Sequence, residues 1–152
     1  MNRTTHQAHR TRRPSALLAA ATGFVAATCV GSRVAARHDL PGRPLRVGVP
    51  LSVPAALAVG WGAGVAAPWP MPVTGLAAAV LAWRDPHRPG PAATMAGLGA
   101  ALLAGTVVEP VTWDRQRAPA ATVAIATNVA AGSLMLVAGV VHLRRCAAHP
   151  GD

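Results

Sequence analysis

The chain alternates between long apolar blocks and short polar segments that are rich in arginine and proline. A helix rises ~1.5 Å per residue, so about 20 apolar residues cross the roughly 30 Å hydrocarbon core of a bilayer. Because four blocks reach this length, the pattern predicts an all-α fold, a multi-pass transmembrane helix bundle. The expected full spans are residues 15–36, 47–67, 92–112 and 118–143.

A shorter apolar block over residues 73–83 leaves the number of spans open. Pro68, Pro70 and Pro72 separate it from the preceding block, because three closely spaced prolines cannot continue a helix. As a helix it measures ~16 Å, about half a bilayer. It forms either a short interfacial or re-entrant helix beside four full spans, or a fifth span completed by flanking residues. The positive-inside rule slightly favours four spans, with the C-terminus inside.

The polar ends of the chain are predicted to lie outside the bundle. Residues 1–14 are expected to form a basic, disordered, cytoplasmic tail, residues 15–145 a single transmembrane domain, and residues 146–152 a short tail. The first apolar block also fits a secretory signal peptide that is cleaved near the small residues 34–36. A first membrane helix is the favoured interpretation, with the long side chain of Arg33 reaching the interface.

The composition agrees with a membrane location. The chain is 52% hydrophobic and only 12% charged, whereas about a quarter of the residues in a soluble domain are charged. The net charge is +9, and all fourteen basic residues are arginine. Since they lie between apolar blocks and not along one face, anionic lipid and the positive-inside bias explain them better than nucleic acid does. We expect a cell-membrane protein with a cytoplasmic N-terminus; its GC-rich coding hints at a bacterial source.

The sequence contains none of the usual signatures of catalysis or cofactor binding. It has no phosphate-binding loop, no dinucleotide fingerprint after a strand, no HExxH and no nucleophile elbow. Cys29 and Cys146 are isolated, which argues against a zinc site. We therefore expect no enzyme, no cofactor and no metal; an intramembrane enzyme is the least favoured class.

The acidic residue Glu109 lies three residues before the end of the predicted span 92–112. Trp113 follows, and tryptophan prefers the headgroup level of a bilayer. The favoured interpretation is an acid near the interface that pairs with Arg115 or Arg117 in the next turn. A charge at this depth costs less than the about 2.5–3.5 kcal/mol measured at a helix centre.

A second interpretation places Glu109 inside the bundle. It ends a small-residue row of Gly97, Ala101 and Gly105, and such rows let helix backbones approach closely. Pro110 lacks the N–H that would bond the carbonyl of Thr106. The freed carbonyl and the carboxylate would then hold a cation, a proton or a water.

The last predicted span carries one stripe of residues at spacings of three and four. Because an asparagine facing lipid would leave its amide unpaired, we expect this stripe to face other helices. The favoured interpretation of the stripe is a helix-packing seam in which Asn128 makes a hydrogen bond. The alternative is a ligand or ion site at Asn128. His142 is expected at the membrane face opposite Glu109, so the two form no acid/base pair. The stripe consists of Ala121, Ile125, Asn128, Gly132, Met135, Gly139 and His142.

Two functional hypotheses follow from these patterns. The first is a non-enzymatic accessory or interaction subunit, bound to lipid and to other membrane proteins or a second copy, and not to nucleic acid. The alternative is a small transporter or channel with a polar path at Glu109, Thr106 and Asn128. The candidate helix-packing residues are Gly60, Gly64, Gly97, Ala101, Gly105, Gly132 and Gly139.

Overall fold

A computed structural model describes residues 15–43, 51–59 and 62–148 of the chain, and the predicted tail over 1–14 lies outside them. The fold is all-helical over these residues, with one isolated backbone bridge between Ala63 and Ala66. The helices are α1 (Ser15–Arg37), α2 (Val53–Val59), α3 (Pro70–Arg84), α4 (Pro89–Val108), α5 (Pro110–Trp113) and α6 (Pro119–Ala148).

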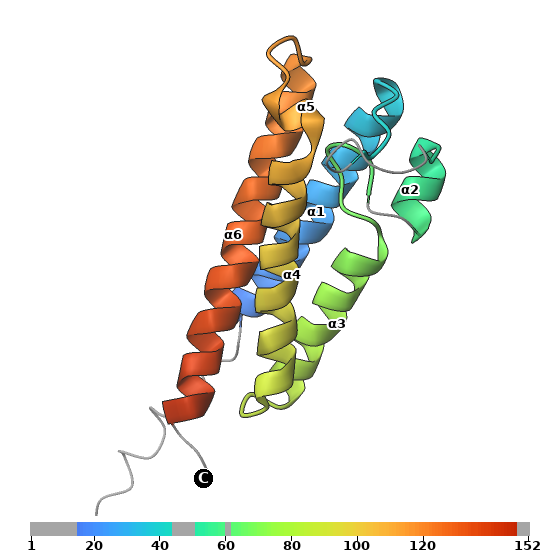
Figure 1. Cartoon of the computed structure of the whole chain (residues 1–152). Coiled ribbons are helices and arrows are strands. Elements are labelled where there is room, and N and C mark those ends of the chain that lie inside the picture. The colour runs from blue at the N-terminus through green and yellow to red at the C-terminus, as the bar shows by residue number, and fades with distance from the viewer. Residues whose placement is uncertain (1–14, 44–50, 60–61, 149–152) are drawn as a thin grey trace, which may run out of the picture.

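Four of these helices form a bundle in which neighbours alternate in direction (Figure 1). Each packs against two others, since α1 contacts α3 and α6, and α4 contacts α3 and α6. The start of α1, the turn between α3 and α4, and the end of α6 therefore lie at one end. We call this the terminal end, and the other, which carries α2 and α5, the capped end.

Three helices are long and apolar enough to cross a membrane: α1 from Ala16 onward, α4 and α6. The four full spans of the sequence prediction are therefore not all present. The prediction of a span over residues 47–67 is wrong, because only the seven residues of α2 are helical among the described part of this block. Its second half is rich in glycine, which disfavours helix, and Gly62 adopts φ 92°, a left-handed conformation.

The short helix predicted over 73–83 begins three residues earlier, at Pro70. Proline is accepted in the first turn of a helix, where the backbone N–H has no intrahelical partner. At 15 residues, α3 is ~22 Å long, shorter than a bilayer core. The non-helical residues 62–69 lead into it beside the second half of α1 (Figure 1). Helix α6 in turn extends through the first residues of the predicted C-terminal tail.

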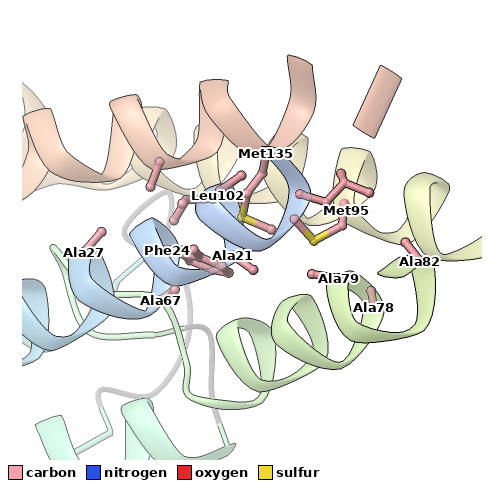
Figure 2. Close-up of a cluster of buried hydrophobic side chains, with 13 residues drawn as sticks. Ala21, Phe24, Ala27, Ala67, Ala78, Ala79, Ala82, Met95, Leu102 and Met135 are labelled. Atoms are coloured by element: carbon pink, nitrogen blue, oxygen red, sulfur yellow. The ribbon is translucent and has the colours of Figure 1, made fainter. Parts of the chain in front are cut away.

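The centre of the bundle is a cluster of small and flexible apolar side chains (Figure 2). Phe24, Met95 and Met135 are each 0% exposed and come from α1, α4 and α6. Most of the remaining members are alanines, which let the helices lie close together in lipid. The other labelled members are Ala21, Ala27, Ala67, Ala78, Ala79, Ala82 and Leu102.

Glycines set the contact between α4 and α6. A Cβ placed on Gly99 would lie 2.6 Å from both the carbonyl oxygen of Gly132 and the amide nitrogen of Leu136. A Cβ placed on Gly139 would lie 2.7 Å from the backbone of Ala92. Gly132 and Gly139 thus occupy the seam that the sequence predicts for them, and Gly99 is the glycine of α4 that meets them.

The predicted inward row of α4 needs correction. Gly97, Ala101 and Gly105 are exposed, and a Cβ placed on either glycine would meet nothing within 4 Å. The row that faces the bundle runs through Met95, Gly99, Leu102 and Thr106. Helix α4 is apolar and rich in small residues all round, so the sequence contains little periodicity that would identify its buried face.

The contact between α4 and α6 predicts different effects on stability for substitutions at two glycines of α4. Gly99→Ala should lower the free energy of unfolding by about 1–3 kcal/mol, because the new methyl group collides with backbone atoms that cannot yield. Gly97→Ala, the matched control, should leave stability unchanged or slightly raised. Unfolding by SDS titration in bicelles measures both, and equal destabilisation by the two variants would contradict the seam.

Candidate functional site

Glu109 sits at a break between two helices. Helix α4 ends at Val108, and Glu109 is extended, with φ −74° and ψ 128°. Pro110 follows as the first residue of α5. A residue before proline is disfavoured in the helical region, so the Glu109-Pro110 pair ends α4 at this point.

The carbonyl groups released by this break are bonded by nearby side chains. The hydroxyl of Thr112 donates to the carbonyl oxygen of Thr106 at 2.6 Å, and the indole N–H of Trp113 donates to that of Val107 at 2.7 Å. The hydroxyl of Thr106 itself donates to the carbonyl of Leu102 at 2.8 Å. The interpretation with a cation at Glu109 requires a free carbonyl at Thr106, but this carbonyl already accepts a hydrogen bond from Thr112.

Glu109 is buried, with 8% of its surface exposed. Its Oε2 accepts a hydrogen bond from the backbone N–H of Arg43 at 3.2 Å, which ties α4 to the segment after α1. The predicted pairing is with Arg115 or Arg117, but the hydrogen bond of the Glu109 carboxyl comes from Arg43. The guanidinium of Arg117 donates to the carbonyl oxygens of Thr112 and Asp114 at 3.1 and 3.0 Å. Glu109 is buried because residues 39–43 fold over the end of α4.

A cavity of about 750 Å³ opens beside Glu109 at the capped end. Besides Glu109, its charged lining residues are Asp39, Arg43, Asp114 and Arg115, so both signs of charge are present. Glu109 lies just beyond the part of α4 that is long and apolar enough to cross a membrane. Burial raises the pKa of its carboxyl group, and the hydrogen bond from Arg43 lowers it by a smaller amount.

Asn128 is 3% exposed and hydrogen-bonds far across the sequence. Its Nδ2 donates to the carbonyl oxygen of Val65 at 2.9 Å. Val65 belongs to the non-helical segment 62–69, and a Cβ placed on Gly31 of α1 would collide with the same carbonyl. Lipid offers no hydrogen bonds, so irregular backbone at this depth must find partners within the protein. Asn128 supplies one.

The three candidate polar residues lie toward one end of the bundle but make separate contacts. The close approaches of Gly99 and Gly139 set the antiparallel register of α4 and α6 and place Thr106 nearly level with Asn128. Glu109 lies about one turn nearer the capped end. Glu109, Thr106 and Asn128 hydrogen-bond to three different backbone groups, those of Arg43, Leu102 and Val65.

The remaining chemically active side chains are distributed over the molecule. The Nε2 of His142 lies 2.9 Å from the carbonyl oxygen of Pro86 at the terminal end, far from Glu109. Gly64 packs against Leu40, which lies in the segment after α1. Gly60 lies outside the described residues. In the part of the chain that the structure describes, no three His, Cys, Asp or Glu residues group to hold a metal ion.

Two residues that the sequence analysis did not single out belong with Asn128. The hydroxyl oxygens of Thr28 and Ser32 on α1 are buried and have no partner among the described residues, and the same holds for Oδ1 of Asn128. The sequence contained one signal for them: Thr28 and Ser32 are four residues apart, on one helix face, and Gly31 lies between them. Gly31 is where the backbone of residues 65–66 approaches α1 closely.

The contact of Asn128 can be tested by replacing the amide with an apolar side chain of similar size. Asn128→Leu should lower the free energy of unfolding by about 1–3 kcal/mol, because the carbonyl of Val65 is left buried and unpaired. Amide hydrogen exchange over residues 62–67 should also rise. Ser133→Ala, on the exposed side of α6, is the control. Unchanged exchange and stability in Asn128→Leu would exclude this role.

The raised pKa of Glu109 predicts how stability changes with pH. Below the usual value of 4.5 the carboxyl is protonated in both the folded and the unfolded chain, so its contribution is fully present. As pH rises through the higher folded pKa, that contribution is lost, because a charged carboxylate is poorly solvated there. The melting temperature of the wild type relative to Glu109→Gln should therefore fall with rising pH; a difference that rises or stays constant would refute the assignment.

Comparison with protein-family models, with curated proteins and with solved structures finds no match to this chain. What the protein does is therefore argued from its own residues and their geometry.

Proposed function

We propose that the chain is a multi-pass protein of the cell membrane with a non-enzymatic role, an accessory or interaction subunit that binds a further transmembrane helix through α4. The binding row consists of Gly97, Ala101 and Gly105. The observation that carries this proposal is their exposure: the bundle covers the opposite face of α4 and leaves this row open.

The physical support is the way helices associate in lipid. Lipid tails are as apolar as leucine, so association depends on close backbone packing and not on the hydrophobic effect. The chain already uses this device in the seam of Gly99 and Gly132. The exposed side of α6 differs, since it carries bulky Val123, Leu134 and Val137, each about 60% exposed, which suit acyl chains.

The arginines are divided almost evenly between the two ends. Among the described arginines, Arg84, Arg88, Arg144 and Arg145 belong to the terminal end, and Arg33, Arg37, Arg43, Arg115 and Arg117 belong to the capped end. Four more arginines precede Ser15, at the start of α1. Positive charge beside membrane helices favours the cytoplasm, so this proposal places the N-terminus there.

The transporter or channel alternative has weaker support. Its polar residues Glu109, Thr106 and Asn128 lie toward the capped end, and below them the bundle is filled by Phe24, Met95 and neighbouring alanines. Such a core opposes the passage of an ion or a polar solute.

Association in a bilayer tests the proposal. The double variant Gly97→Leu/Gly105→Leu should lose, by tenfold or more, the dimer fraction seen by single-molecule photobleaching in liposomes, because bulky side chains hold a partner helix away. Gly23→Leu on α1, where a Cβ also meets nothing within 4 Å, is the control.

If the partner is another membrane protein, a photo-crosslinker at Ala101 in the native membrane should capture one defined species, and the double variant should not. A wild type that is monomeric at all lipid dilutions and forms no crosslink at Ala101 would contradict the proposal.

A further inference from the structure

Three buried oxygen atoms have no hydrogen-bond partner among the described residues: Oγ1 of Thr28, Oγ of Ser32 and Oδ1 of Asn128. Thr28 is 0% exposed and Asn128 is 3% exposed. A buried polar group without a partner costs about 1–3 kcal/mol, so such groups are rare in folded proteins. Three of them in one bundle require a physical explanation.

The helix register places the three residues at similar depths in the bundle. A Cβ placed on Gly75 would meet both Phe24 of α1 and Met135 of α6, so these two residues lie side by side. Because the two helices are antiparallel, moving seven residues along each brings Gly31 level with Asn128. Both border the carbonyl of Val65, which agrees with this register.

The two hydroxyl groups bracket this level on α1. Thr28 lies ~4.5 Å below Gly31 along the helix axis and Ser32 ~1.5 Å above it. Residues four apart share one face of a helix. The unpaired oxygens of α1 therefore flank the depth of the unpaired amide oxygen of α6.

We propose that Thr28, Ser32 and Asn128 form a binding site for buried water between α1 and α6. The amide orientation is fixed, since Nδ2 of Asn128 donates to Val65 and Oδ1 is left as an acceptor. Each hydroxyl can donate and accept. Water also does both, and buried waters typically make about three hydrogen bonds to groups that otherwise have no partner.

Water fits this site better than a cation. The three oxygens are uncharged, and Glu109, the acidic residue nearest in depth, follows the end of α4 and accepts the N–H of Arg43. A cation would also leave the hydroxyl hydrogens unpaired. The cavity beside Glu109 is lined by Gly64, which adjoins Val65, so it borders the segment whose carbonyl Asn128 binds.

Water-edited solid-state NMR of the full chain in lipid tests the site directly. Magnetisation from water should reach the Asn128 side-chain amide several-fold faster than the methyl group of Met135, which lies in the apolar core. In the double variant Thr28→Val/Ser32→Ala the transfer to Asn128 should fall several-fold. Thr106→Val, which removes a buried hydroxyl that has its own partner, should leave it unchanged.

Transfer to Asn128 as slow as transfer to Met135 in the wild type would overturn the proposal, and this comparison needs no variant to fold. A melting temperature that rises when sodium replaces a bulky organic cation, and does so only while Thr28 and Ser32 are present, would overturn it in favour of a cation site.

Discussion

The backbone of a protein in lipid must find all its hydrogen bonds within the protein, and this chain meets that constraint at one irregular segment. Residues 62–69 are not helical, yet they lie against α1 inside the bundle. The amide of Asn128 bonds the carbonyl of Val65, and Gly31 leaves room for it. Without these two residues, the passage from α2 to α3 would carry an unpaired carbonyl into an apolar interior.

Small side chains solve a second problem, which is how helices attract one another when the solvent is also apolar. Gly99, Gly132 and Gly139 bring the backbones of α4 and α6 together, and alanines do the same around Phe24. Close packing replaces the hydrophobic effect as the source of cohesion. The same feature on the outer face of α4 is the basis for proposing a partner helix there.

Most of the buried polar side chains lie toward the capped end, where the chain breaks its helices. At Glu109 the following proline ends α4, and Thr112 and Trp113 bond the released carbonyls. The segment after α1 covers the carboxylate through the N–H of Arg43. This arrangement links the segment after α1 to the end of α4, two parts of the chain that are distant in sequence.

The sequence by itself determined the helical class, the membrane-crossing length of α1, α4 and α6, and the inward stripe of α6. Block length and the single Asn128 carry that information, because an amide cannot face lipid. Only the tertiary structure decided that residues 47–67 do not span and that Gly99, not Gly97, meets α6. It alone showed that Arg43 covers Glu109. The physical reason is that an apolar helix with small residues on every side has no intrinsic inner face, so backbone fit against its neighbours selects one.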